Sequence, residues 1–537
     1  MEARSGPVQD LPDAPIGVVG AGTMGSGIAQ VAAVGGLDVK LFDALEGAAD
    51  RAATRIGEHL RRGVERGRMT QEAANAALQR IQPIDRIEDL KGCFLVAEAA
   101  PEKLQLKREL FSHLAGICGP QTVLATNTSS IPVTAVASGI DHQERVVGMH
   151  FFNPVPLMNL VEVIAGMNSG EGALSIAREV ARRMGREPIN ASDGPGFLVN
   201  RVSRPFLLEA QRLLQERVAT PEVIDKVVRL GGGFRMGPFE LSDLVGVDVG
   251  YDIARSFFEL SHHEPRWQPS GIPPQLIAAG RLGRKSRHGY YSYPEGGEHR
   301  PPDPPALLPE NAVGAVQIIG DGAVADQLRR LAQGAGYEVL KQGQHSEHEP
   351  AILVDARLQD AGTNLPLSGP PIAILLAAHS LASAAGQRDA VGFHCLPPLG
   401  ESHLIELTRS ANTSEESATA AKHFFHSVGK HVEWVDDAPG LVLGRIVCQL
   451  INEAAFATME GVGSPADIDK GVQLGLNYPR GLLQWADVIG INHVLATLDA
   501  LRADVGGDRY RAAPLLRRMA AEGRTGRAAG AGFYPYE

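Results

Sequence analysis

The chain contains two copies of one pattern, and this repeat constrains the fold more than any other feature. Residues from His150 to Ile164 read HFFNPVPLMNLVEVI, and a later segment reads HCLPPLGESHLIELT. Each copy places a His twelve positions before a Glu (162 − 150 = 12 and 406 − 394 = 12): His150 with Glu162, then His394 with Glu406. The chain is therefore expected to build one structural unit twice.

A glycine-rich turn lies well ahead of the first copy. Residues 16–44 read IGVVGAGTMGSGIAQVAAVGGLDVKLFDA, which predicts a strand, a tight turn, a helix and a second strand ending at Asp43. In such a turn the glycines let the backbone approach a pyrophosphate, and the helix N-terminus faces its charge. The Asp43 carboxylate can accept hydrogen bonds from ribose hydroxyls and repels a 2′-phosphate. This charge favours NAD over NADP as the cofactor. FAD is a less favoured alternative, which stays open because flavoproteins share the glycine-rich turn. The predicted cofactor contacts here are Gly20, Gly22, Thr23, Met24, Gly25 and Asp43.

Short polar and charged side chains follow the next two predicted strands. Glu102 and Lys107 come after one buried strand, and Asn127 and Ser129 come after the next. The carboxyl ends of parallel strands meet at the ligand crevice of a doubly wound sheet, so we predict that these side chains face the cofactor. Ser130 has a competing role as the cap of the following helix.

The segment around His150 has the pattern of an acid–base pair. One predicted strand delivers His150, Asn153 opens a stiff Asn-Pro-Val-Pro turn, and a second strand carries Glu162. A hairpin of this size can bring the carboxylate to one imidazole nitrogen, which fixes the tautomer. The other nitrogen can then take a hydroxyl proton as hydride leaves the carbon, which is general base catalysis. A lone His is more often structural, but the cofactor-binding turn and the orienting acid favour the catalytic interpretation.

An arginine-rich helix is predicted over residues 48–68, with Arg66 near its end. The structural interpretation is a solvated helix face. The functional one is a cationic arm for the phosphates of a large anionic substrate.

Five motifs together resemble the L-3-hydroxyacyl-CoA dehydrogenase family, which includes the 3-hydroxybutyryl-CoA dehydrogenases. They match in order and spacing over residues 14 to about 295: GAGTMGSGIAQ, EAAPEKLQLKRELF, TNTSSIPVT, HFFNPVPLMNLVEVI and DGPGFLVNRV. The chain is most similar to the long bacterial form with an extra C-terminal unit. That form includes members that oxidise 3-hydroxyadipyl-CoA in phenylacetate breakdown.

The resemblance implies a role for each matching residue. His150 would be the general base and Glu162 its partner. Ser129 and Asn200 would bind the hydroxyl and thioester oxygens of an acyl-CoA substrate, and Asn153 would lie near the catalytic His and the nicotinamide. The NAD site would include Asp43, Glu102 and Lys107.

The resemblance also extends to the region after Asn200. The helical domain of that region would close one side of the acyl-CoA cleft and form a dimer interface. Earlier in the chain, Arg66 is a candidate contact for a CoA phosphate. One departure from the family is Asn159, where Lys is common.

The second copy has lost most features that accompany His150. It aligns at an offset of 300 near its start and of 244 later, so 56 residues are missing (300 − 244 = 56), between the equivalents of Asp43 and His150. We therefore predict that the His394–Glu406 pair is a structural relic. The losses are Ala325 for Gly25, Gly343 for Asp43, Pro397 for Asn153 and Gly444 for Asn200.

The predicted architecture is an α/β Rossmann-type nucleotide domain plus an all-α domain, followed by a degenerate duplicate of both. The later helices keep their pattern better than the later nucleotide motif does. This suggests that the second helical domain packs on the first and mimics, within one chain, the dimer contact of shorter family members. A homodimer and a monomer with such an intramolecular pseudo-dimer both stay open. The predicted boundaries are 14–195 (NAD domain), 196–295 (helical), 296–312 (linker), 313–438 (degenerate Rossmann-like) and 439–537 (second helical).

Composition excludes several other classes of protein. A net charge of −11 argues against a nucleic-acid partner, and no apolar run is long enough to span a membrane. The four cysteines show no metal-type spacing and are expected to be buried in a reducing, cytoplasmic protein. The His-rich stretches SHHEP and HSEHEP have the polar surroundings of solvated loops, so no metal site is predicted.

Two rival functions remain for the first copy. A dehydrogenase of free hydroxy acids more often uses Lys as its base, and it does not need an arginine-rich helix to bind the phosphates of CoA. A non-catalytic acyl-CoA or dinucleotide sensor would not need His150, Glu162, Ser129 and Asn200 together. We therefore predict an NAD-dependent enzyme that oxidises (S)-3-hydroxyacyl-CoA.

Overall fold

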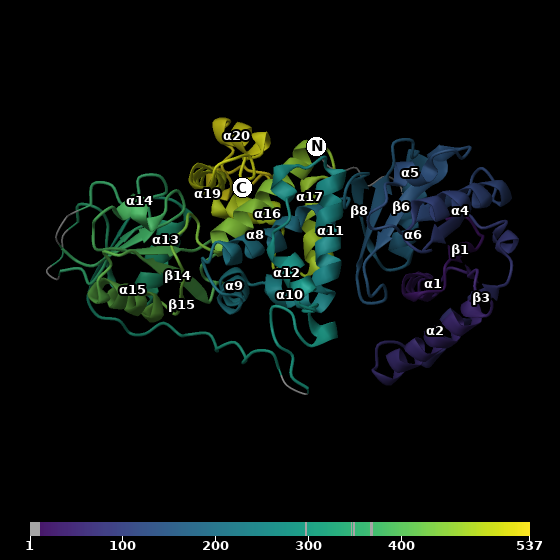
Figure 1. The fold of residues 1–537 in the computed structure, drawn as a ribbon, viewed down its shortest axis with the longest axis horizontal. Helices are drawn as coiled ribbons and strands as arrows, with labels where there is room; N and C mark the ends of the chain where they lie inside the picture. The colour runs from purple at the N-terminus through teal and green to yellow at the C-terminus, as the bar shows by residue number, and fades with distance from the viewer. Residues whose placement is uncertain (1–10, 296–297, 345, 347–348, 366–368) are drawn as a thin grey trace. The chain divides into compact units, whose positions relative to one another are not determined.

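The glycine-rich turn belongs to an eight-stranded sheet (Figure 1). Seven strand pairings include six parallel ones, and only β6 and β7 pair antiparallel. Strands β1, β4 and β5 are buried along their whole length, as expected for a parallel sheet with helices on both faces. In spatial order the strands are β3 (Ile81–Ile84), β2 (Val39–Phe42), β1 (Ile16–Val19), β4 (Leu95–Glu98), β5 (Val123–Thr126), β6 (Val146–Phe151), β7 (Leu160–Ala165) and β8 (Glu187–Ser192).

Helices that connect these strands supply the rest of the core. Alanines and β-branched residues of α1 face the sheet, and Leu174, Ala177 and Val180 of α6 are buried. The helices are α1 (Thr23–Val34), α2 (Ala48–Glu65), α3 (Gln71–Gln79), α4 (Leu104–Ile117), α5 (Val133–Ala137) and α6 (Glu171–Arg183).

Helices alone follow β8, as the loss of strand periodicity predicts. Thr220 caps α9 by accepting a hydrogen bond from the N–H of Val223, and Pro221 fills the first helical position. This region contains α7 (Val199–Val202), α8 (Arg204–Gln215), α9 (Pro221–Lys226), a π-helical turn (Val227–Gly231), α10 (Pro238–Val245), α11 (Val247–Leu260) and α12 (Ile272–Ala278).

A second, seven-stranded sheet confirms the predicted duplication. It repeats the topology of the first, including one antiparallel pair, β13 with β14. Within the described part of this copy, nothing corresponds to α2, α3 and β3, which accounts for most of the missing residues. In spatial order the strands are β10 (Glu338–Leu340), β9 (Ala315–Ile319), β11 (Leu353–Asp355), β12 (Ile372–Leu375), β13 (Val391–His394), β14 (Leu404–Arg409) and β15 (His431–Trp434).

The second copy also repeats the helical part. Its sheet carries α13 (Ala323–Gly334), α14 (Leu381–Ala385) and α15 (Glu415–Ser427). The chain then forms α16 (Leu443–Met459), α17 (Pro465–Leu476), α18 (Leu482–Ile489), α19 (Ile491–Val505) and α20 (Pro514–Ala521).

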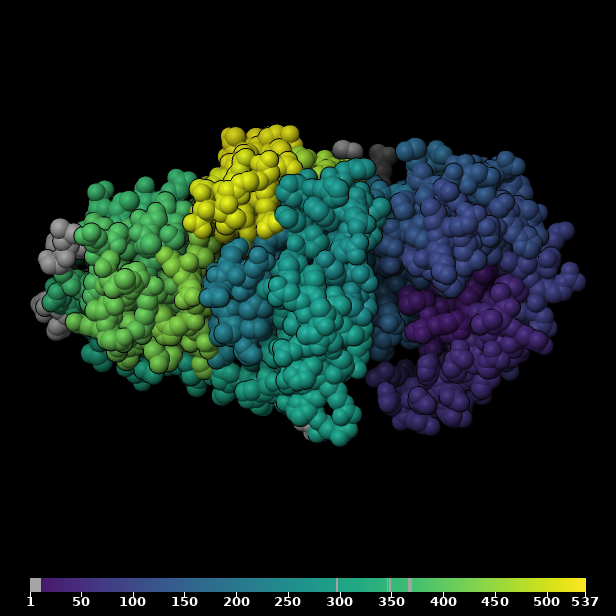
Figure 2. Space-filling view, viewed as in Figure 1, coloured from purple at the N-terminus to yellow at the C-terminus, as the bar shows by residue number. Residues whose placement is uncertain are grey.

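The chain forms two compact units that do not follow sequence order. The first unit joins Met1–Arg201 to Glu460–Leu476, so α17 lies beside β8 (Figure 1). The second unit joins Val202–Met459 to Asn477–Glu537. Within it, the α8–α9 region borders the second sheet domain (Figure 2). The domain boundaries expected from the sequence stay predictions, because these units cut across them.

Helices α8 and α16 pack against each other inside the second unit. A buried ion pair joins them, with Arg445 Nε 3.1 Å from Glu209 Oε2, and the Tyr510 hydroxyl donates to the same carboxylate. The two predicted helical domains therefore contact each other within one chain, as the pseudo-dimer hypothesis requires.

The structure, a computed structural model, describes residues 11–295, 298–344, 346, 349–365 and 369–537. The tail up to Asp10, the start of the predicted linker and three of the six residues of HSEHEP lie outside these residues. All four cysteines are free thiols and buried, as expected. Over the described ranges, no helix is long and apolar enough to cross a membrane.

Candidate active site

The β6–β7 hairpin brings His150 and Glu162 together. The two residues are direct partners in the antiparallel register, and His150 Nδ1 lies 2.5 Å from Glu162 Oε2. The His150 side chain is only 8% exposed, and that of Glu162 is fully buried. Because bulk water is largely excluded, this hydrogen bond fixes the imidazole orientation more firmly than an exposed pair would.

The second oxygen of Glu162 is held by the backbone. Glu162 Oε1 accepts hydrogen bonds from the N–H groups of Leu198 (3.1 Å) and Val199 (2.8 Å), at the start of α7. With both oxygens engaged as acceptors, Glu162 receives the Nδ1–H of His150. The lone pair of the neutral imidazole is then on Nε2, where it can take a proton.

Aromatic rings and one amide complete the surroundings of His150. The rings of Phe152 and Phe197 lie 4.6 Å and 5.9 Å from the imidazole, centroid to centroid. Asn127 Oδ1 accepts the N–H of Phe151 at 2.9 Å. Asn127 therefore ties the end of β5 to the strand that carries His150.

Glu102 organises the loop that carries Ser129. Its Oε1 accepts hydrogen bonds from the Thr128 hydroxyl (2.5 Å), the Ser129 N–H (3.0 Å) and the Ser130 N–H and hydroxyl. Burial disfavours its charge, but these bonds and the nearby Lys107 outweigh that effect and lower the pKa of Glu102. Glu102 thus fixes the backbone from which Ser129 projects. Cofactor contacts by Glu102, Asn127 and Ser129 stay predictions.

Lys107 is fully buried rather than open to solvent. Its ammonium lies 2.6 Å from Glu98 Oε1 and 3.4 Å from Glu102 Oε2. Glu98 also accepts from the Thr126 hydroxyl and the Ala100 N–H. Lys107 therefore acts on the loop through these two carboxylates, and its predicted contact with the cofactor is untested.

The glycine-rich turn has the geometry that a dinucleotide requires. Gly20 has φ +101°, and a Cβ on Gly25 would lie 1.7 Å from the Gly20 carbonyl oxygen, so both positions need glycine. A Cβ on Gly22 would meet nothing within 4 Å, which leaves open space before Thr23 and Met24 at the start of α1.

Asp43 fixes this turn from the end of β2. Its Oδ2 accepts the Ala21 N–H at 2.6 Å, and its Oδ1 accepts the Leu45 N–H at 2.9 Å. The residues present therefore fit a pyrophosphate at the helix N-terminus and a ribose beside the carboxylate.

A cavity of about 650 Å³ connects the turn to the β6–β7 loop, where Asn153 lines it, and to the basic face of α2. Arg55, His59, Arg62 and Arg66 recur along that face at the spacing of helix turns. His59 was missed from sequence, although this i, i+4 spacing could have revealed it. The basic residues that line the cavity are Arg55, His59, Arg62, Arg66 and Arg68.

The other two predicted positions lie close to the hairpin in different ways. Asn200 follows Val199 directly in α7, so it sits at the helix start that holds Glu162. Asn159 is exposed just before β7, where Arg186 approaches its Oδ1 at 3.4 Å. The substrate role predicted for Asn200 stays a prediction.

The second His–Glu pair keeps its register but not its hydrogen bond. His394 and Glu406 face each other across β13 and β14, yet Glu406 accepts the N–H groups of Val442 and Leu443 instead. His394 Nε2 lies 3.2 Å from His493 Nε2, and its Nδ1 is buried without a partner among the described residues.

Burial leaves this second pair uncharged. It raises the pKa of Glu406 to about 8, despite the two backbone donors, and holds the pKa of His394 well below its usual value, with His493 adding to the effect. A Cβ at Gly444, the equivalent of Asn200, would lie 2.2 Å from the His394 ring. The imidazole therefore fills the space that an Asn side chain would need, in agreement with the predicted relic.

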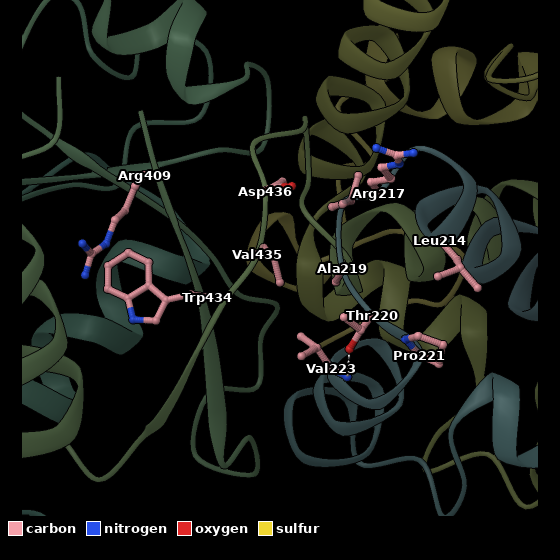
Figure 3. Close-up of a pocket in the computed structure, with 11 residues that line it drawn as sticks. Leu214, Arg217, Ala219, Thr220, Pro221, Val223, Arg409, Trp434, Val435 and Asp436 are labelled. Atoms are coloured by element: carbon pink, nitrogen blue, oxygen red, sulfur yellow. Dashed lines mark hydrogen bonds between the residues drawn. The ribbon is translucent and has the colours of Figure 1, made fainter. Parts of the chain in front are cut away.

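Another cavity, of about 660 Å³, lies in the second unit (Figure 3). The α8–α9 connection lines one side, and Trp434, with the Arg409 guanidinium 4.2 Å over its ring, lines the other. No residue of either His–Glu pair lines this cavity.

Comparisons with known proteins match both parts of the first copy and the helical part of the second. Residues 15–194 match the family model described as "3-hydroxyacyl-CoA dehydrogenase, NAD binding domain". Residues 196–293 and 440–536 match "3-hydroxyacyl-CoA dehydrogenase, C-terminal domain".

Curated relatives carry consistent names. The chain is 36% identical over 505 residues to the 3-hydroxyadipyl-CoA dehydrogenase of Escherichia coli K12, covering 94% of this chain and 97% of that one. It is 41% identical over 280 residues to a probable 3-hydroxybutyryl-CoA dehydrogenase of Deinococcus radiodurans, covering 52% and 99%. A crystal structure of an E. coli 3-hydroxybutyryl-CoA dehydrogenase superposes with a TM-score of 0.80 at 35% identity, covering 95% of this chain and 99% of that one.

Proposed function

The chain belongs to the 3-hydroxyacyl-CoA dehydrogenase family, and on that basis we propose that it oxidises (S)-3-hydroxyacyl-CoA to 3-oxoacyl-CoA with NAD⁺. One observation supports this reaction above all. A buried His150–Glu162 pair is joined by a 2.5 Å hydrogen bond in the same domain as a glycine-rich turn that fits a dinucleotide.

The proton in this reaction is handled by His150. Nε2 takes the proton of the substrate hydroxyl, which makes the ring an imidazolium. Glu162 stabilises this cation, because its carboxylate lies 2.5 Å from Nδ1. Bound NAD⁺ would supply the hydride acceptor. Ser129 and Asn200 are proposed to hold the hydroxyl and thioester oxygens, and Asn153 to lie beside the nicotinamide.

The direct test is absorbance at 340 nm with acetoacetyl-CoA and NADH. We expect NADH to be consumed only when the acyl-CoA is present. Binding of both ligands without turnover would instead support a sensor, and turnover of free acetoacetate at a similar rate would support a free hydroxy-acid dehydrogenase. The same assay with butyryl-type, adipyl-type and longer chains ranks the acyl groups.

NAD is the proposed cofactor because Asp43 lies where a 2′-phosphate would add negative charge. In an Asp43→Asn variant, we expect the preference for NADH over NADPH, as a ratio of kcat/KM, to fall roughly 10- to 100-fold. This is the size expected when one charged hydrogen-bonding partner is lost. Asp38→Asn, at an exposed position before β2, is the control and should keep the wild-type ratio. An unchanged ratio in both variants would contradict the role of Asp43.

The basic cavity is the proposed site for the CoA phosphates. Replacing Arg66 with Ala should raise KM for the acyl-CoA roughly 10-fold while leaving KM for NADH unchanged, because a charged contact to phosphate is lost. The increase should shrink at high ionic strength. Arg86→Ala removes an exposed arginine that does not line the cavity and should change neither constant. An equal rise in both constants would argue against Arg66 as a CoA contact.

The proposed working form is a cytoplasmic monomer with an internal helical pseudo-dimer, and a homodimer is the alternative. The α8–α16 contact supports the first, since it already buries the ion pair of Arg445 with Glu209. Light scattering coupled to gel filtration separates the two forms by mass.

A further inference from the structure

A segment from the C-terminal copy is part of the catalytic unit. Residues Glu460–Leu476, including α17, lie along β8 within the first compact unit. The Ser192 N–H donates to the Val462 carbonyl at 2.8 Å, and its hydroxyl donates to the Gly461 carbonyl at 2.9 Å. The edge of the catalytic sheet is thus completed by residues about 270 positions later in the chain (|i−j| = 269).

Ion pairs reinforce this contact along the segment. Arg201, at the end of α7, lies 2.6 Å from Glu460, and Lys470 lies 2.6 Å from Glu187. Both α7 and β8 are therefore linked to the C-terminal segment by ion pairs, and β8 is linked to it by the hydrogen bonds of Ser192 as well.

Three glycines let the segment come close to the residues that hold Glu162. A Cβ on Gly463 would lie 2.8 Å from Leu198, and one on Gly471 would lie 2.8 Å from Val199. The N–H groups of Leu198 and Val199 are the two backbone donors to Glu162 Oε1. The segment therefore packs against the side chains of the two residues whose backbone N–H groups hold the carboxylate.

Gly475 makes the corresponding contact on the His150 side. A Cβ there would lie 2.8 Å from Leu160, 3.4 Å from Val199 and 3.6 Å from Phe152. Phe152 is the ring beside His150, and Leu160 begins the strand that carries Glu162. The backbone of Gly475 is not in the left-handed region, so only the neighbouring side chains disfavour a larger residue there.

The same contact exists in the second copy, where no acid–base pair has formed. At the offset of 244, the Asp436 N–H donates to the Val218 carbonyl at 2.8 Å, beside the cavity of Figure 3. Gly231, the equivalent of Gly475, faces Leu443, whose N–H donates to Glu406. Substitutions at Gly231 therefore serve as a control, because they test the same packing at a place where no acid–base pair is present.

We propose that Gly471 and Gly475 of α17 are positioning residues for the His150–Glu162 pair, so that the C-terminal copy completes the catalytic domain of the first. This inference rests on the proposed function. It explains why the helical part of the second copy keeps its pattern while the nucleotide part has lost it. The first copy uses a helix that only the second copy supplies.

The test compares Gly475→Ala and Gly475→Val with the matched variants Gly231→Ala and Gly231→Val. We expect the Gly475 variants to lower kcat roughly 10-fold or more through misplacement of the pair, with KM for NADH within about 2-fold of wild type. The Gly231 variants should keep the wild-type kcat. The Tm should fall by a few degrees in both Gly475 variants and in Gly231→Val, where the added side chain meets its neighbours closely. Gly231 has slightly more room, with Leu443 at 3.4 Å, so Val is included at both positions.

A second readout does not depend on turnover. Modification of His150 by diethylpyrocarbonate, followed by mass spectrometry across pH, should change its pH dependence in Gly475→Ala but not in Gly231→Ala. Equal loss of kcat in both series, or wild-type kcat and His150 modification in the Gly475 variants, would overturn the inference. If wild type shows no turnover but the modification differs between the two series, the proposed reaction fails and the positioning role stands. Should Gly475→Val not fold, the Ala pair decides.

Discussion

His150→Ala should lose most of its activity, with kcat falling by roughly 10²–10⁴, the usual contribution of a general base. The reason is local: Nε2 is the only nitrogen of His150 left for the substrate, because Nδ1 is bound to Glu162 at 2.5 Å. Steady-state kinetics with acetoacetyl-CoA and NADH measure the loss. Binding of NADH, followed by fluorescence, should change little, since the glycine-rich turn does not involve His150.

The second copy provides the matched control, His394→Ala. His394 is buried against His493 and has no hydrogen bond to Glu406, so its removal should lower stability but leave kcat per folded molecule unchanged. A large loss of kcat in His394→Ala, with the protein still folded, would mean that the second pair takes part in the reaction. Retained activity in His150→Ala would refute the general-base role.

The local parts of this molecule were predictable from sequence. The turn from Gly20 to Gly25 and the spacing of His150 and Glu162 are determined by neighbouring residues, so the order of elements follows from periodicity and glycine positions. A comparison of the two copies also predicted that the second copy has lost its site, because Gly343 replaces Asp43 and Gly444 replaces Asn200. The structure supplies the reason at Gly444, where the His394 ring occupies the space.

The long-range parts were not predictable. Nothing in the sequence around Gly475 shows that α17 packs on Leu160 and Val199, because this contact joins segments hundreds of residues apart. Likewise, Lys107 reads as a cleft residue, but only the fold shows that its ammonium is buried against Glu98. Spacing along the chain reveals what a segment can form, whereas burial and pairing depend on which segments meet.

Glu162→Gln should reduce kcat almost as strongly as loss of His150, by roughly 10²–10⁴, while the protein stays folded. The amide oxygen of Gln can still accept the N–H groups of Leu198 and Val199. Its NH₂ group then faces His150 Nδ1, which must become an acceptor, so the proton moves to Nε2. The imidazole would sit in the same place as the wrong tautomer, unable to take a hydroxyl proton. A Tm close to wild type with the large kcat loss is the expected combination.

Glu406→Gln is the matched control, and its stability should differ from wild type in a pH-dependent way. Burial raises the pKa of Glu406 from 4.5 to about 8, so the folded chain binds this proton more tightly than the unfolded chain. The stability that the protonated carboxyl provides is complete below pH 4.5 and is lost as the pH rises towards 8. Glutamine does not titrate, so the variant does not lose this stability. Its free energy of unfolding should therefore rise relative to that of wild type by roughly 1.4 kcal/mol per pH unit within that window. Denaturant unfolding at pH 5, 6.5 and 8 measures the gain, and kcat should match wild type. A stability difference that is constant across these pH values would show that Glu406 is already ionised in the folded chain, and a loss of kcat would give the second copy a part in catalysis.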